Sequence, residues 1–205
     1  MTRLRGATLR PRHLQELLNA IGDAMLTPTA APLASFIAGK VIQRLERTGL
    51  IDHGPDLRRR IPDGLDVALA RAGRDRSCVN VARKLTEFRH ALEWRHGRGG
   101  QFESMNFARS HSHATIVGPG GLEDRSDTSI GATFMQPYTR FPDHILGASR
   151  AFMLLAPGEV YSESSGWLTL TAGHVFAMEV GQQFAMRCSS TPFLVLWCNL
   201  EPAAL

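Results

Sequence analysis

The feature that most constrains the fold is a succession of short apolar segments in the second half of the chain, each ended by turn-forming residues. These segments span residues 114–121, 128–137, 150–160, 166–180, 184–188 and 192–200. Gly and Pro interrupt them too often for long helices, and short apolar or alternating runs between turns are typical of strands. They predict an all-β sandwich or barrel, with a tight hairpin turn at 156–159.

The first half has the periodicity of helices instead. Apolar residues at Leu14, Leu17, Leu18, Ile21 and Met25 recur at the spacing of one helical face, which predicts an amphipathic helix after Pro11. Similar spacing predicts helices over 33–45, with Phe36 on the apolar face, and over 65–72 and 78–94. A Gly and Arg cluster at 96–100 predicts a loop. We therefore expect an α+β chain, with a helical N-terminal region at 1–97 and a β-barrel at 101–205.

Composition separates the two halves and limits the classes of function. The formal charge is +8 through residue 100 and −4 from residue 101 onward. Almost all basic residues are Arg, which genome composition explains as well as a partner does, and no helix-turn-helix spacing is evident, so nucleic-acid binding is not favoured. No apolar run is long enough to cross a bilayer, and the first residues lack a secretory signal pattern. We expect a cytoplasmic protein without membrane contact.

Several motifs of the second half agree in order and spacing with one known family. The segments 116–127 (IVGPGGLEDRSD), 141–144 (FPDH), 154–160 (LLAPGEV), 166–167 (GW), 185–187 (AMR) and 192–200 (PFLVLWCNL) resemble those of the bacterial dimethylsulfoniopropionate lyase family of cupins. The resemblance implies a cupin jelly roll that binds a divalent transition metal (Zn, Mn or Fe). It also implies cleavage of dimethylsulfoniopropionate into acrylate and dimethyl sulfide by β-elimination. A metal assists such a reaction by stabilising charge on the substrate carboxylate while a base removes the neighbouring proton.

The chain departs from the family pattern at most of the metal-binding positions. The resemblance implies the pattern His-x-His-x3-Glu-x-Tyr and a further His before AMR, and only the first of these is kept, as His144. The other positions carry Leu146, Arg150, Phe152 and Phe184. Leu and Phe offer no lone pair to a metal, Arg adds positive charge, and Phe cannot serve as a base. We therefore expect no bound metal and can assign no catalytic residue.

A rebuilt metal site is the alternative. His111 and His113 form an HxH pair, and together with His144 and His174 they are the remaining candidate ligands for a divalent metal. We expect instead that His111 and His113 are surface residues of a polar loop, because two ligands without a located third make no site. His174 is expected to be a hydrogen-bonded residue of the barrel wall.

The remaining expectation concerns the inside of the barrel. An aromatic cavity there would suit an apolar ligand, or a quaternary ammonium or sulfonium cation held by cation–π attraction, although an inward Arg would oppose a cation. The alternative is a solid core of the same side chains. The sequence thus predicts a diverged, metal-free cupin, either non-catalytic or binding a small molecule; the other hypotheses are an active lyase and a ligand-sensing regulator whose helical half binds DNA. A homodimer is expected from the fold alone. The predicted pocket residues are Phe141, His144, Leu146, Arg150, Phe152, Trp167 and Phe184.

Overall fold

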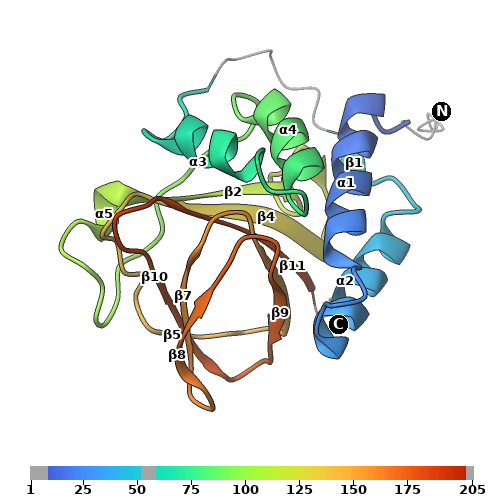
Figure 1. Ribbon diagram of the computed structural model, residues 1–205. Helices are drawn as coiled ribbons and strands as arrows, with labels where there is room; N and C mark the ends of the chain where they lie inside the picture. Colours follow the sequence, from blue (N-terminus) through green and yellow to red (C-terminus); the bar gives the residue numbers. More distant parts are fainter. Residues whose placement is uncertain (1–8, 52–58, 202–205) are drawn as a thin grey trace, which may run out of the picture.

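The computed structural model describes residues 9–51 and 59–201, which form two facing β-sheets with helices packed against the larger one (Figure 1). None of the described helices is long and apolar enough to cross a membrane. The helices are α1 (Arg12–Met25), α2 (Pro32–Arg44), α3 (Leu65–Ala72), α4 (Val79–Phe88) and the short α5 (Phe107–Ser110).

The strands divide between a seven-stranded and a four-stranded sheet. The larger has the order β1-β3-β2-β4-β11-β6-β9 and the smaller the order β5-β10-β7-β8. The mixed α and β class and the jelly-roll architecture predicted from the sequence are confirmed, although the two sheets do not join into one closed barrel. The larger sheet contains β1 (Leu50–Ile51), β3 (Glu123–Asp124), β2 (His111–Val117), β4 (Thr128–Met135), β11 (Phe193–Leu200), β6 (Arg150–Leu154) and β9 (Val175–Met178); the smaller contains β5 (His144–Ile145), β10 (Gln183–Arg187), β7 (Gly158–Ser162) and β8 (Gly166–Leu170).

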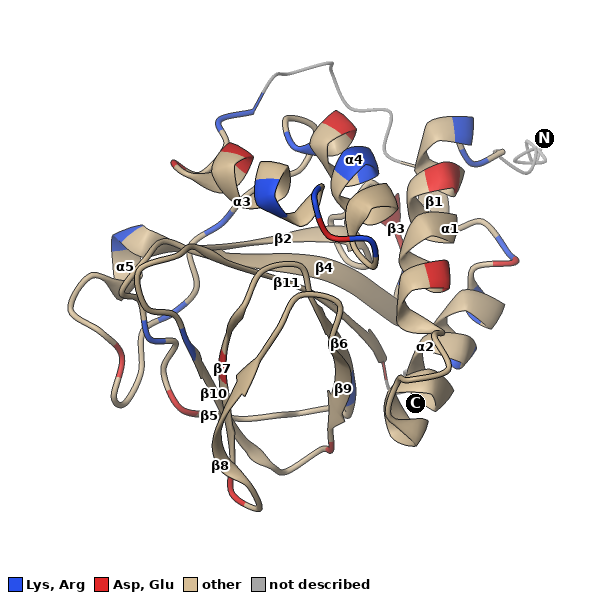
Figure 2. Ribbon diagram, viewed as in Figure 1, with Lys and Arg blue, Asp and Glu red and all other residues tan. Residues whose placement is uncertain are grey.

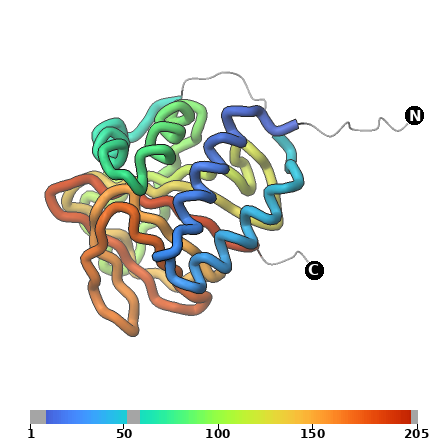
Figure 3. The backbone as a smooth tube through the Cα atoms, turned by 45° about the vertical axis from the view of Figure 1, so that its right-hand side comes forward, coloured from blue at the N-terminus to red at the C-terminus, as the bar shows by residue number. Residues whose placement is uncertain are grey.

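Helices α1 and α2 lie side by side along one flank of the molecule, as the turned view in Figure 3 shows. All five apolar residues that predicted the first helix are buried. Two details of the helix predictions are wrong. Phe36 is 58% exposed, because α2 turns a narrower face to the sheet than the apolar pattern suggests. Helix α4 ends at Phe88, and the indole of Trp94 beyond it donates a hydrogen bond to the carbonyl of Arg89.

Each strand of the seven-stranded sheet sends alternate side chains into two different apolar clusters. On β11, Leu194 and Leu196 pack with the helices, whereas Phe193 and Val195 point into the space between the sheets. Because side chains alternate across a strand, a residue's position fixes which cluster it joins. The helices and one face of the sheet therefore share a single apolar core. The predicted division near residues 97–101 lies in the segment between α4 and α5, and as a domain boundary it stays a prediction.

The predicted hairpin at 156–159 is wrong. The strand before it, β6, pairs with β11 and β9, whereas the strand after it, β7, pairs with β10 and β8. The segment is thus a corner that carries the chain from the larger sheet to the smaller one. Pro157 and Gly158 specify a change of direction but not the strand that will be the partner. A Cβ at Gly158 would collide with the ring of Phe193, so this corner also needs the space that only glycine leaves.

Acidic and basic side chains are interspersed on the helical side of the molecule. Figure 2 shows Asp and Glu among the Lys and Arg of α1, α3 and α4. Lys84 contacts Glu16 at 2.6 Å, and Arg89 contacts Asp66 at 2.8 Å. The positive surplus of the first half is therefore interspersed with carboxylates over these helices.

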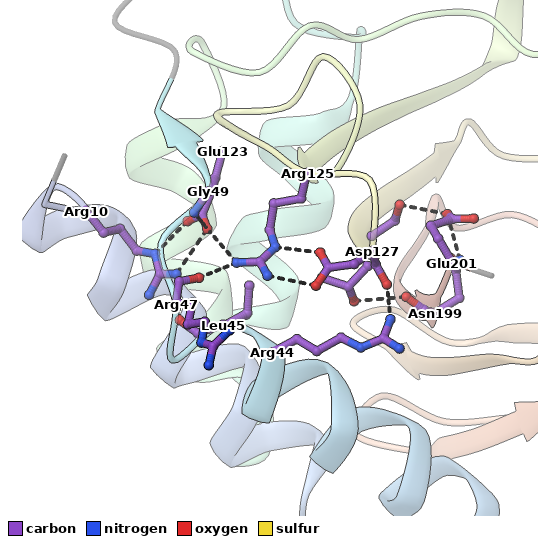
Figure 4. Close-up of polar contacts among 12 residues, drawn as sticks. Arg10, Arg44, Leu45, Arg47, Gly49, Glu123, Arg125, Asp127, Asn199 and Glu201 are labelled. Atoms are coloured by element: carbon purple, nitrogen blue, oxygen red, sulfur yellow. Dashed lines mark hydrogen bonds and ion pairs between the residues drawn. The ribbon is translucent and has the colours of Figure 1, made fainter. Parts of the chain in front are cut away.

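A buried carboxylate ties the N-terminal segment to the sheet. Glu123 of β3 is fully buried and accepts hydrogen bonds from Arg10 at 2.6 Å, from the backbone N–H of Gly49 at 2.7 Å and from Arg125 at 3.3 Å (Figure 4). Burial opposes its ionisation, but these donors outweigh burial and leave the pKa of Glu123 below its usual range. Arg125 also donates two hydrogen bonds to Asp127, which extends the network toward β4.

The variant Glu123→Gln should lower the free energy of unfolding by about 3 kcal/mol, because it leaves two poorly solvated guanidinium groups without their shared carboxylate. Chemical denaturation at neutral pH measures this. The neighbouring variant Asp124→Asn changes an exposed carboxylate on the same strand and should cost less than about 0.5 kcal/mol. Equal losses in the two variants would contradict this account of the network.

Candidate functional site inside the jelly roll

The strands direct most of the predicted site residues toward a shared interior. Phe184 of β10 lies opposite His144 of β5, and Phe152 of β6 lies opposite Trp197 of β11. Residues paired directly across two antiparallel strands point to the same side of their sheet. The two sheets then bring the pairs together, since the ring centroids of Phe152 and Phe184 are 4.9 Å apart.

A continuous line of ring contacts runs through this interior. The ring of His144 lies 4.9 Å from that of Phe141 and 5.2 Å from that of Phe184, which stacks on Phe152. Leu146 is buried in the same apolar cluster. Phe152 and Phe184 are each 1% exposed. The positions that the resemblance assigns to metal ligands and base therefore do meet in space at 144, 146, 152 and 184, with three apolar side chains and one imidazole.

Trp167 is not part of this group, in contrast to the expectation. Trp167 of β8 lies opposite Tyr161 of β7. Tyr161 follows the inward-facing Val160 in the strand, so Tyr161 and Trp167 face the other side of the sheet. The ring of Trp167 packs under two guanidinium groups, those of Arg187 at 4.1 Å and Arg140 at 5.5 Å. Trp167 therefore belongs to the outer face of the four-stranded sheet.

Arg150 does point inward. It lies opposite Asn199 on the face of β6 and β11 that also carries Trp197, and its guanidinium carbon is 4.7 Å from the centre of the Trp197 ring. The side chain is partly buried, and its Nε is shielded from solvent without a hydrogen-bond partner among the described residues. Burial lowers the pKa of Arg150, while the charge of Glu201 acts in the opposite direction.

Sequence analysis missed the role of Trp197. Its Nε1 donates a hydrogen bond to the hydroxyl of Thr133 at 3.1 Å, so the indole lies along β4. Gly131 makes this orientation feasible, because a Cβ there would collide with the Trp197 ring. The alternation of PFLVLWCNL places Trp197 on the same face as Phe193 and Val195, but the glycine opposite it is revealed only by the register of β4 with β11.

The expectation for His111 and His113 is wrong, because both lie in strand β2 rather than in a surface loop. They face the interior, opposite Met135 and Thr133 of β4. His111 is 1% exposed, and its Nδ1 accepts a hydrogen bond from Gly97 at 3.2 Å, while its Nε2 has no partner among the described residues. Burial, helped by nearby His113 and His96, lowers the pKa of His111 to about 3.

The expectation that His174 is a hydrogen-bonded residue of the barrel wall is wrong. His174 is exposed in the turn that precedes β9, and its ring is 6.2 Å from that of Phe176. Its backbone, rather than its imidazole, takes part in the hydrogen bonds that hold this turn against Leu154. The structure therefore brings His111, His113 and His144 to the inner side of the sheets but leaves His174 outside.

A divalent metal does not fit the side chains of this interior. In residues 9–51 and 59–201, no three His, Cys, Asp or Glu side chains stand close enough to share an ion. The rings of His111 and His144 both pack on Phe141, at 5.0 and 4.9 Å. The orphaned Nε of Arg150 can only donate, and its positive charge would repel a cation. The absence of bound metal in the protein itself stays a prediction.

Part of the interior is nevertheless accessible to solvent. Trp197, on a central strand and facing inward, is only partly buried, and so are His113, Thr115, His144 and Arg150. Met135, Leu154, Val160, Met186, Phe193 and Val195 fill the opposite end completely. Side chains on the inner faces of two covered sheets can be exposed only if water reaches the space between them. The interior is therefore fully packed at one end, whereas the side chains beside Trp197 and Arg150 are only partly buried.

Comparison with solved structures assigns the fold class. The DMSP lyase DddQ from Ruegeria pomeroyi DSS-3 aligns with a TM-score of 0.66 and 18% sequence identity over 96% of this chain and 95% of that chain. A chain from the crystal structures of the DMSP lyases RdDddP and RnDddQII aligns with a TM-score of 0.66 and 15% identity over 94% of each. At such low identity the likeness establishes a shared fold, which is a jelly roll with an added helical layer.

The sequence itself identifies the family. The family model for dimethylsulfoniopropionate lyase matches residues 35–195, which is most of the chain. The chain therefore belongs to the dimethylsulfoniopropionate lyase family. A comparison with curated proteins gives no significant match.

Protonation of the interior should destabilise the fold as the pH falls. The pKa of His111 is lowered from 6.5 to about 3, so the unfolded chain binds a proton that the folded chain rejects between these values. Stability is complete above pH 6.5 and falls below it, by about 2 kcal/mol at pH 5 from His111 alone. Burial also lowers the pKa values of His113 and His144, which adds to the effect.

Denaturant unfolding between pH 7.5 and 5 measures this dependence, and the variant His111→Gln should flatten it. The variant His174→Gln changes an exposed imidazole and should keep the dependence of the parent protein. An unaltered pH dependence in His111→Gln would contradict the assignment of a buried neutral imidazole.

Proposed function

We propose that this chain is a diverged member of its family that no longer performs the metal-assisted elimination and instead binds a small molecule between its sheets. The observation that supports the proposal most strongly is which side chains occupy the positions where the resemblance implies metal ligands. Leu146, Phe152 and Phe184 meet there around His144, and Arg150 adds a positive charge nearby. This interior is suited to binding, because it is apolar, partly open and lined by few polar groups.

Loss of the elimination follows from the chemistry that the reaction needs. Negative charge accumulates on the carboxylate side of the substrate as the proton leaves, and a metal ion provides the electrostatic stabilisation in such a reaction. One imidazole beside two phenyl rings cannot hold that ion. Phe152 has no hydroxyl to act as the base at the position where the resemblance implies tyrosine.

Binding of a small molecule is supported by the distribution of solvent access. Were the interior only a packing core, every inward-facing ring would be covered, as Phe152 and Phe184 are. Trp197 remains partly exposed although it faces inward from β11, which has a neighbouring strand on each side, and His113 is partly exposed on the inner face of β2. The open part thus combines an aromatic surface with a guanidinium and two imidazoles, a composition typical of a binding site for a small polar-headed molecule.

The test is elemental analysis together with an assay for dimethyl sulfide. The protein is expressed with manganese, iron and zinc supplied and purified without chelator or affinity tag. We expect far less than one metal per chain and no dimethyl sulfide above the protein-free control when dimethylsulfoniopropionate is added with any of these metals. About one metal per chain, with release of dimethyl sulfide that His144→Ala abolishes, would establish the active lyase instead.

A restored variant supplies the matched control. Leu146→His, Arg150→Glu, Phe152→Tyr and Phe184→His together recreate the pattern that the resemblance implies around His144. Because the backbone already brings these positions together, the fourfold variant should bind about one zinc ion per chain, which isothermal titration calorimetry measures. Failure of both the parent and the variant to bind zinc would mean that the backbone, rather than the side chains, excludes the metal.

A further inference from the structure

The guanidinium of Arg150 lacks a counter-charge in direct contact. Among the described residues it forms no ion pair, and its Nε has no hydrogen-bond partner. The charge of Glu201 raises the pKa of Arg150 without an ion pair between them, and Oε1 of Glu201 accepts hydrogen bonds from Ser129 and Asn199 at 2.8 Å each. A cation removed from water without a partner is costly, and retaining one on the inner face of a barrel is unfavourable for stability alone.

The protein nevertheless holds this group in a defined place. The ring of Trp197 supports the guanidinium at 4.7 Å, Thr133 fixes the indole by a hydrogen bond, and Gly131 leaves room for it. A planar guanidinium stacked on an aromatic face keeps its N–H edge free for a planar acceptor such as a carboxylate. The guanidinium is therefore oriented in advance to donate hydrogen bonds to an anion, unlike a solvated surface arginine.

The surrounding groups define the charge of the ligand. His113 and His144 face the same interior, and burial is the main cause that lowers both of their pKa values, so both are neutral at pH 7. The charges of Arg95, His96 and Arg150 add to the effect at His113, and that of Arg150 adds to it at His144. The guanidinium of Arg95, which is bridged to His113 beside β2, is paired with Glu93 at 2.8 Å, whereas Arg150 forms no ion pair among the described residues. No other Arg or Lys of the described strands lies on the inner face of either sheet. A single fixed positive charge repels a cationic ligand and matches one negative charge.

The aromatic side chains near Arg150 indicate the chemistry of the uncharged part of the ligand. The rings of Phe152 and Phe176 stack at 5.1 Å beside Trp197, and Phe184 continues this surface on the opposite sheet. Phe176 is partly exposed on the edge strand β9, two residues before Met178, which lies opposite Arg150. An apolar body against these rings would gain from burial while its charged end meets Arg150.

Building on the proposed function, we propose that the interior binds a small monocarboxylate with an apolar body, whose carboxylate pairs with Arg150 on the Trp197 ring. This assignment excludes the quaternary ammonium or sulfonium ligand that an aromatic cavity alone would allow. It also gives a reason for an arginine at a position where an apolar side chain would be more stable.

The experiment is isothermal titration calorimetry of the purified full chain in EDTA, with benzoate and propionate as carboxylate probes and benzamide as the neutral analogue of benzoate. We expect at least one carboxylate to bind, and benzamide to bind at least tenfold more weakly than benzoate, because it cannot form the charge-assisted pair. Arg150→Met should weaken carboxylate binding at least tenfold, and Gly131→Ala should weaken it by displacing the Trp197 ring.

Arg187→Met is the matched control, since Arg187 also stacks on a tryptophan, at 4.1 Å, but on the outer face, and it should leave binding unchanged. A second readout separates recognition from folding: Arg150→Met should raise the melting temperature of the ligand-free protein while it weakens binding, because it removes an unpaired charge. A melting temperature below that of the parent would show that Arg150 serves stability instead.

Three results would overturn the assignment: no binding of either carboxylate, equal binding of benzamide and benzoate, or binding of inorganic phosphate in place of both. Each of these leaves the proposed loss of the elimination intact, because metal content and dimethyl sulfide release decide that question separately. Conversely, a metal-loaded active lyase would end the proposed function whatever the carboxylate titrations show.

Discussion

The structure depends on burial of the seven-stranded sheet on both faces. One face packs against the helices and the other against the interior of the jelly roll, so a side chain on β4, β6 or β11 has only two environments open to it. A shift of one residue in register would exchange these environments for a whole strand. The alternation therefore fixes Phe152 and Trp197 inside and Ala151 and Cys198 under the helices. The buried Glu123 network holds the edge of this sheet to the N-terminal segment.

Under the proposed function, that constraint explains how the family's backbone can persist while its chemistry changes. Phe184 and Phe152 occupy positions that still converge, and they stack on each other instead of sharing an ion. Exchange of polar ligands for large apolar groups leaves no unpaired acceptor behind and adds buried apolar area. Arg150 departs from this logic, because its Nε is a buried donor without a partner among the described residues. The proposed recognition of an anion gives a reason for Arg150 that packing does not.

The helices with a strong apolar stripe could be predicted from the sequence almost to the residue, as α1 and α3 show. Features that depend on long-range pairing could not. The two-residue strands β1, β3 and β5 carry too few residues to display a period, and the corner at Pro157 has the same turn residues as a hairpin. The convergence of Phe152 and Phe184 followed from the resemblance, whereas Trp197 as the support of Arg150 requires the register that places Gly131 opposite it. The location of His111 was predicted wrongly, because the sequence alone does not distinguish a histidine buried in a strand from one in a polar loop.

The most direct test of the central claim is a crystal structure of the protein grown with manganese and zinc, with anomalous scattering measured at both absorption edges. The account predicts no anomalous peak between the sheets, with the rings of Phe152 and Phe184 stacked where a metal would otherwise lie. An ordered peak within bonding distance of His144 would contradict it, since such a peak would mean that the interior still holds the ion on which the family's elimination depends.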